Sequence, residues 1–217
     1  MTRALDSLLE HPALWRGRQG APASGDAVWP AGTPELETAL GGGWPRGQLV
    51  ELLGAPFGSG ETRLLVPMLA ACARARLWIA LIGPPATPWL PGWQQLGIPP
   101  ERVLLVRADQ DGERLWSAEQ CLRDPAFGVL LIWIHGPAET ARLRRLRLAA
   151  GESRACAVLY RPPQAAEQPS PAHQRLQWQP HGRGLRLHFL KGNGAQYRRG
   201  RPLDISVAHP PPAEDAP

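Results

Sequence analysis

Residues 50–65 read VELLGAPFGSGETRLL, which is an apolar run, a glycine-rich turn and the start of a helical pattern. Glycines in such a turn let backbone N–H groups converge on an anion, and phosphate-binding loops place a lysine and then a Ser or Thr after the last glycine. Here Gly60 is followed by Glu61 and Thr62, and five residues instead of four separate Gly54 from Gly60. The pattern therefore predicts a strand, a tight turn and a helix, without the lysine that would hold a phosphate.

The acid at position 61 changes what this loop can bind. A carboxylate about 4 Å from a phosphate charge is repelled by roughly 1 kcal/mol in water and roughly 4 kcal/mol at an effective dielectric of about 20. Since a lysine would attract by a similar amount, the exchange weakens phosphate binding on the order of a thousandfold or more. An acid in the first helical turn also complements the helix dipole, which favours a structural turn, with residual anion binding as the alternative. We therefore expect a degenerate phosphate loop without a cofactor, made of Gly54, Gly58, Ser59, Gly60, Glu61 and Thr62.

Strand and helix patterns alternate from residue 33 onward. Apolar runs predict strands at 48–53, 77–82, 102–106, 128–134 and 155–160. Helical patterns predict helices at 33–40, 61–75, 91–96, 112–122 and 138–149. Thr33 is the expected N-cap of the first helix, and Asp109 or Asp111 that of helix 112–122. Repeated βα units indicate an α/β fold with a mainly parallel sheet flanked by helices, followed by a C-terminal β-hairpin with strands near 175–179 and 185–191.

The chain divides into three parts. Residues 1–30 form a helical arm and a Gly/Pro/Ala linker, residues 31–201 form the α/β core, and residues 202–217 form a tail whose end we expect to be disordered. The three cysteines are widely spaced in apolar segments and lack the spacing of a zinc site, so we expect no metal and a reducing, cytoplasmic location. The longest apolar stretches are too short to span a bilayer.

Basic residues concentrate in the second half of the chain. The net charge is +5, and residues 138–201 carry 13 basic residues against three acidic ones. This distribution favours nucleic acid or an acidic partner, and a solvated arginine-rich face explains it equally well. The candidate contact residues are Arg142, Arg144, Arg145, Arg147, Arg198, Arg199 and Arg201. Tryptophans in arms and loops are candidate anchors for a partner protein, in particular Trp15 and Trp29.

Several segments resemble the RecA-type ATPase core over roughly residues 31–191. TPELETALGGGWPRGQLVELLG is similar to the RecA lead-in to its phosphate loop, and LWIALIG, LGIPPERVLLVRADQDGE and GVLLIWI continue the resemblance. Within that superfamily the chain most resembles ImuA, the RecA- and SulA-related accessory protein of bacterial damage-induced translesion synthesis. The segments that carry this match are HPALWRG, GGGWPRGQLVELL, the lysine-free GSGETRLLVPMLA and LRLHFLKGNG.

The resemblance implies a RecA-like fold whose chemical positions are lost. Glu61 stands at the lysine position, and Pro84 and Pro85 stand where a strand-end acid would activate water. Trp133 lies near the position of the metal-associated aspartate. Phosphoryl transfer needs charge neutralisation, a metal anchor and an oriented water. We therefore expect that the protein is not an enzyme.

The resemblance also implies partners. An ImuA-like protein would be a non-catalytic adaptor of the SOS mutasome that binds an ImuB-like pseudo-polymerase and, with it, an error-prone replicative-type polymerase. In RecA-like proteins the loops after the central strands face DNA; the matching segments here are His135–Thr140 and Arg161–Gln174, so DNA contact and self-association are further hypotheses. The alternatives are a SulA-like inhibitor of the tubulin-like division protein and a DNA-binding modulator of recombination.

Overall fold

The protein is described by a computed structural model over residues 28–54, 57–192 and 201–206. Its centre is an eight-stranded sheet with the order β10-β9-β8-β3-β7-β6-β4-β5. The strands of this sheet are β3 (Gln48–Leu53), β4 (Trp78–Ile82), β5 (Val103–Val106), β6 (Phe127–Trp133), β7 (Cys156–Arg161), β8 (Gln174–His181), β9 (Gly184–Lys191) and β10 (Leu203–Ser206). A separate two-stranded ladder joins β1 (Val28–Trp29) and β2 (Trp44–Pro45).

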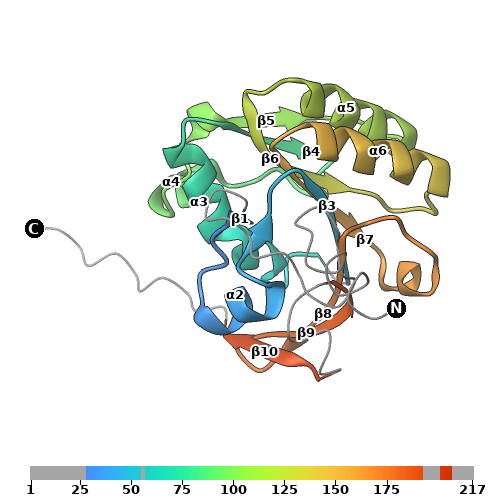
Figure 1. Ribbon diagram of the computed structural model, residues 1–217. Helices are drawn as coiled ribbons and strands as arrows, with labels where there is room; N and C mark the ends of the chain where they lie inside the picture. Colours follow the sequence, from blue (N-terminus) through green and yellow to red (C-terminus); the bar gives the residue numbers. More distant parts are fainter. Residues whose placement is uncertain (1–27, 55–56, 193–200, 207–217) are drawn as a thin grey trace, which may run out of the picture.

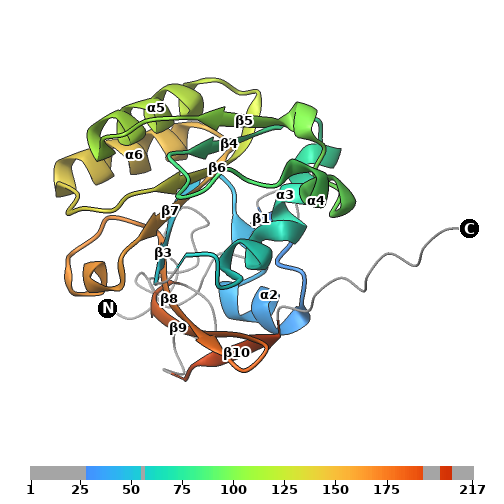
Figure 2. The ribbon, with the colours of Figure 1, turned by 180° about the vertical axis from the view of Figure 1, so that it is seen from behind.

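Helices cover both faces of this sheet (Figures 1 and 2). The α-helices are α2 (Pro34–Leu40), α3 (Val66–Arg74), α4 (Leu90–Gln95), α5 (Asp111–Arg123) and α6 (Thr140–Glu152). Short 3-10 helices are η2 (Glu61–Leu65), η3 (Pro100–Arg102) and η4 (Pro163–Glu167). The six strands from β8 to β5 pair in parallel, and β9 and β10 continue the sheet antiparallel. The predicted α/β fold with a mainly parallel sheet and a C-terminal hairpin is confirmed.

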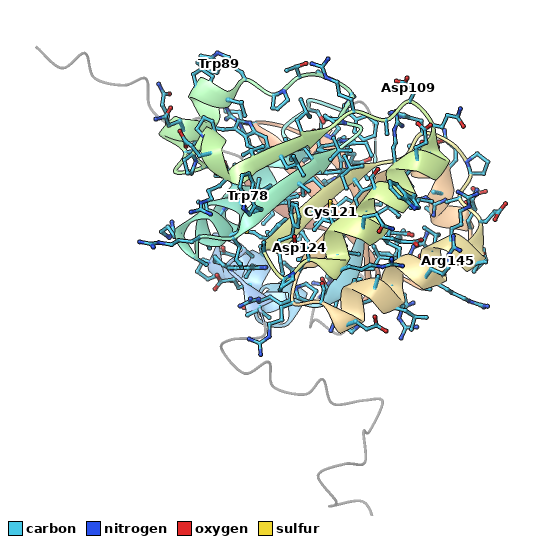
Figure 3. The ribbon with its side chains drawn as sticks, turned by 90° about the horizontal axis from the view of Figure 1, so that it is seen from above. Trp78, Trp89, Asp109, Cys121, Asp124 and Arg145 are labelled. Carbon is cyan, nitrogen blue, oxygen red and sulfur yellow. The ribbon has the colours of Figure 1, made fainter. Side chains whose placement is uncertain are left out.

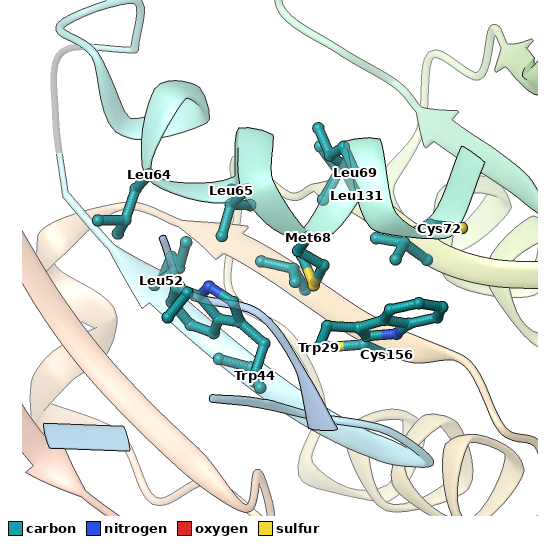
Figure 4. Close-up of a cluster of buried hydrophobic side chains, with 14 of the residues drawn as sticks. Trp29, Trp44, Leu52, Leu64, Leu65, Met68, Leu69, Cys72, Leu131 and Cys156 are labelled. Carbon is teal, nitrogen blue, oxygen red and sulfur yellow. The ribbon is translucent and has the colours of Figure 1, made fainter. Parts of the chain in front are cut away.

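One face of the sheet packs against α2 and α3. Alternate residues of β3, Val50 and Leu52, point to this side because side chains alternate along a strand. From α3, Met68 and Cys72 are four residues apart on the same helical face, and both are fully buried. Figure 4 shows this cluster, in which the indole of Trp29 also packs.

The opposite face packs against α5 and α6. Here Leu49 of β3 joins Leu115 of α5 and Leu143 and Leu146 of α6, all of them buried. Figure 3 views the molecule with α5 and α6 side by side over this face. No helix in the described part of the chain is long and apolar enough to cross a membrane.

Most predicted elements are confirmed, with three differences. The segment after the glycine loop begins as η2, and α3 starts only at Val66, because Pro67 favours a helix start at that point. The predicted cap of α5 at Asp109 or Asp111 is wrong, since Gln110 is the N-cap and Asp111 the first helical residue. Residues 203–206, which the sequence assigned to a tail, pair with β9 as strand β10.

Candidate functional site

The glycine loop follows β3, and its glycines have structural reasons to be there. Gly58 (φ 88°) and Gly60 (φ 106°) adopt the left-handed backbone conformation that favours glycine. Gly54 lies against Trp178 of β8, where an added Cβ would come within 2.3 Å of the indole ring. The loop shape and this close packing therefore call for glycine whether or not a ligand binds.

Glu61 folds back into the loop. Its side chain is only 3% exposed, and Oε1 accepts the Gly58 N–H at 2.8 Å. Oε2 is buried and has no hydrogen-bond partner among the described residues. A glycine-loop N–H is the donor that phosphate-binding loops direct at their anion. Here the loop's own carboxylate accepts it.

Aromatic side chains fill the region beside the loop. Trp133, at the end of β6, stacks on Tyr160 of β7 with ring centroids 4.9 Å apart and an interplanar angle of 13°. Phe57 meets Tyr160 and His135 edge-on. Burial, together with the nearby Glu61 carboxylate, raises the pKa of Tyr160 above its ordinary value, so the phenol stays protonated. The carboxyl ends of β6 and β7 are thus packed with rings.

The carboxyl end of β4 leads into a small polar cleft. Pro84 and Pro85 line this cleft, whose volume is about 250 Å³, together with Arg114 of α5. The Arg114 guanidinium is already engaged, because it donates to the Asp111 carboxylate at 2.9 Å and to main-chain carbonyls. In the part of the chain described here, no group of three or more His, Cys, Asp or Glu residues is arranged to hold a metal ion.

The loop after β6 is tied to α5. Besides pairing with Arg114, the Asp111 carboxylate accepts the backbone N–H groups of His135 and Gly136, the latter at 2.8 Å. The Asp111 oxygens are thus occupied by Arg114 and by the loop after β6, and Asp111 does not cap its own helix. The first two residues of the segment His135–Thr140 are therefore fixed to α5 by hydrogen bonds to Asp111.

The loop between β7 and β8 is held by a buried ionic network. Glu51 of β3 is fully buried and lies between Arg161 at 3.4 Å and Arg175 at 2.8 Å. The hydroxyl of Ser170 donates to the same carboxylate at 2.6 Å, and Arg161 also donates to Gln168. Arg175 further donates to main-chain carbonyls of η4. The loop that the resemblance to RecA would direct at DNA is therefore fastened to the sheet.

The basic residues of α6 fall into two sets. Arg142 pairs with Glu139 at 3.7 Å, and Arg145 pairs with Glu119 of α5 at 3.6 Å (Figure 3 labels Arg145). Arg144 and Arg147 lie on another side of the helix and are exposed. Arg201 is also exposed, and Arg198 and Arg199 lie outside the described residues.

The candidate tryptophan anchors are only partly within the structure. Trp29 is 6% exposed and packs in the core beside α3, and the Arg46 guanidinium lies 4.4 Å from its ring centroid. Because its indole faces the core, the interpretation of Trp29 as a surface anchor is corrected. Trp15 lies outside the described residues. Among the described tryptophans, Trp89 and Trp116 are the most exposed.

By its fold and its glycine loop, the chain is an α/β protein in which strand β3 is followed by a turn that resembles a phosphate-binding loop. No family model matches the chain. The chain is 32% identical to the cell division inhibitor SulA of Edwardsiella piscicida over 50% of its length and 64% of that protein. It is 31% identical to RecA of Porphyromonas gingivalis and 33% identical to RecA of Oleidesulfovibrio alaskensis, each over 49% of the chain. These matches cover 31% and 30% of the RecA sequences. The chain is thus similar to SulA and RecA over about half its own length, and spans less than two thirds of either relative.

Sequence reasoning missed the two charge networks. Glu51 lies within an apolar run, and Arg161 and Arg175 lie at the ends of predicted strands. A charged residue inside an otherwise apolar strand was the signal that could have indicated a buried ion pair. The Asp111–Arg114 pair carried no comparable signal, because both residues fit an ordinary solvated helix start. Partners that meet across strands can only be identified once the sheet order is known.

Proposed function

We propose that this protein is a non-catalytic, cytoplasmic RecA-like adaptor of damage-induced translesion synthesis, which binds an ImuB-like pseudo-polymerase and supports an error-prone polymerase. The observation that carries the non-catalytic part is Glu61, whose buried carboxylate accepts a glycine-loop N–H. The adaptor part rests on the similarity to RecA and SulA and on the resemblance of the loop and its flanking segments to ImuA.

Three features support the absence of phosphoryl transfer. Glu61 places negative charge where a lysine would neutralise phosphate. Pro84 and Pro85 supply no carboxylate at the end of β4, and the ring of Trp133 is stacked on Tyr160 at the end of β6. Such chemistry needs charge neutralisation, a metal anchor and a positioned water together.

Hydrolysis of ATP by the full chain tests the non-catalytic part. We expect no turnover above the buffer background, with or without Mg²⁺, for the wild type and for Thr62→Ala alike. Thr62 holds the one position at which a RecA-like loop would keep its metal-binding hydroxyl. Mg²⁺-dependent turnover that disappears in Thr62→Ala would refute this part of the proposal.

Co-purification with an ImuB-like protein tests the adaptor part. The full chain should retain the partner through size-exclusion chromatography. In cells, deleting the gene that encodes this chain should lower the frequency of damage-induced mutations. A parallel sample that lacks residues 1–30 shows whether the arm contributes. If the partner is not retained by the full chain and mutation frequency is unchanged, the adaptor role is wrong.

A second candidate function is inhibition of cell division, because the SulA match covers the larger share of its relative. Overexpression separates the two. An adaptor leaves cell length unchanged, whereas a division inhibitor produces filaments. Filamentation without any effect of the deletion on mutation frequency would reverse the order of the two candidates.

A further inference from the structure

Helix α6 carries exposed arginines whose side chains have no ion-pair or hydrogen-bond partner among the described residues. Arg142 and Arg145 form ion pairs with Glu139 and Glu119, whereas the guanidinium groups of Arg144 and Arg147 form no ion pair or hydrogen bond with another described residue. Arg144 and Arg147 are three residues apart, so they occupy neighbouring positions on one helical face.

A histidine and a lysine lie beside this face. Ala172, buried in the cluster beneath α6, places His173 next to it, and the His173 N–H donates to the Leu49 carbonyl at 2.8 Å. Lys191, at the end of β9, is exposed, and its ammonium donates to the Ser170 carbonyl at 3.2 Å. Burial, Lys191 and Arg147 lower the pKa of His173. Burial and the Arg175 and Arg147 charges likewise lower the pKa of Lys191.

Three acids of this region, Glu139, Glu152 and Glu51, are ion-paired or lie on another side of α6. Residues 138–201 contain three acids, and one of them, Glu167, is exposed at the end of η4. Glu139 pairs with Arg142, and Glu152 lines the groove between α5 and α6 on the other side of the helix. Glu51, the acid that acts on Lys191, is fully buried and shared by Arg161, Arg175 and Ser170. Arg144 and Arg147 therefore face solvent without an ion-pair partner among the described residues.

We propose that the cations Arg144, Arg147 and Lys191, together with the neutral imidazole of His173, bind the phosphate backbone of nucleic acid. These four residues are here called the cationic α6 surface. This goes beyond the adaptor function, because the surface lies on a different side of the fold from the glycine loop and requires no protein partner. Phosphate contacts from Arg and Lys position a protein on DNA without reading its sequence.

The composition of the surface favours nucleic acid over an acidic protein. Protein interfaces are organised around buried apolar or aromatic anchors. The large exposed apolar side chains of the described residues are Trp78, Trp89, Leu104, Trp116 and Leu148. Of these only Leu148 lies on α6, and it lines the groove toward α5. A phosphate backbone needs no such anchor, because release of counterions supplies the free energy.

Fluorescence anisotropy with a labelled duplex and a labelled single strand of roughly 30 nucleotides tests the proposal. The full chain should bind both without sequence preference, and binding should weaken steeply between about 50 and 200 mM salt. Arg144→Ala/Arg147→Ala should lower affinity about tenfold and reduce the slope of log K against log salt by about 2 on duplex DNA, because each lost phosphate contact removes about 0.9. Lys191→Ala should remove about one further unit of slope.

The matched control is Arg142→Ala/Arg145→Ala, which removes the same charge from the same helix at ion-paired positions. Thermal melting of each variant checks that it is folded. Equal losses of affinity and slope in the two double variants would overturn the proposal, as would a wild type that does not bind DNA at low salt. If polyglutamate displaces the DNA at equal charge concentration, the surface serves an acidic protein instead, and the proposal is wrong. Because no pseudo-polymerase enters this assay, its outcome is independent of the co-purification experiment.

Discussion

Individual residues decide how the glycine loop closes. Glu61 satisfies the Gly58 N–H, and Gly54 admits the Trp178 ring to the end of β3. The sequence identified both positions as unusual, but it could not predict where the carboxylate points. Glu61 is the first residue of η2, and its carboxylate lies near Tyr160, which Phe57 contacts edge-on.

At Gly54 we predict a packing defect on substitution. Gly54→Ala should lower the free energy of unfolding by about 1–3 kcal/mol, because the new methyl group would overlap the indole of Trp178. Chemical denaturation measures the change. Gly151→Ala is the matched control, since an added Cβ there meets nothing within 4 Å and alanine favours helix, so it should stabilise α6 by about 0.5–1 kcal/mol. A Gly54→Ala protein as stable as the wild type would contradict the observed packing.

His173 makes stability depend on pH. Its pKa in the folded protein is lowered from 6.5 by burial, Lys191 and Arg147. Between the lowered value and 6.5 the unfolded chain binds more protons, so this contribution to stability is present above pH 6.5 and is lost as the pH falls. Thermal melting from pH 7.5 to pH 5 should show a decline that is smaller in His173→Gln. Identical declines in both proteins would rule out His173 as the cause.

At the scale of elements, the loop after β7 depends on one buried acid. Glu51 lies between two arginines from β7 and β8 and also holds Ser170. The strand that contains Glu51 was predictable from its apolar neighbours. Its partners were not, because β7 and β8 lie on opposite sides of β3, and this order is known only from the folded sheet.

We predict that Glu51→Gln is strongly destabilising. Loss of the charge leaves the Arg161 and Arg175 cations buried without compensation, which costs about 3–5 kcal/mol. Urea denaturation measures this, and hydrogen exchange should show faster exchange at Ala172, whose N–H is held by Ser170. Glu139→Gln at the exposed Arg142 pair is the control and should change stability by about 0–1 kcal/mol. Equal effects of the two substitutions would contradict a structural role for the network.

At the scale of the whole molecule, a RecA-like α/β fold is combined with a glycine loop whose Gly58 N–H is bound by the Glu61 carboxylate. For a fold of this kind the melting temperature reports on ligand binding, since a ligand present at 100 times its Kd adds about 2.7 kcal/mol of stability. We predict that millimolar Mg-ATP leaves the melting temperature unchanged, because Glu61 occupies the glycine loop. Glu61→Gln removes the repulsion and is the informative comparison. A clear upward shift for the wild type would show that the loop still binds nucleotide.

The α/β class, the order of the elements and the lysine-free loop follow from the sequence alone, because apolar periodicity and glycine placement are local properties of the chain. The sequence also located the excess of positive charge in residues 138–201. The tertiary structure decided which of those cations are free. Arg142 and Arg145 pair with acids, whereas Arg144 and Arg147 have no ion-pair partner among the described residues, and Arg147 lies near His173 and Lys191. It likewise decided that Glu61 turns inward and that Trp29 is buried. Pairing of charges and burial of rings depend on contacts between distant segments, which only the folded sheet brings together.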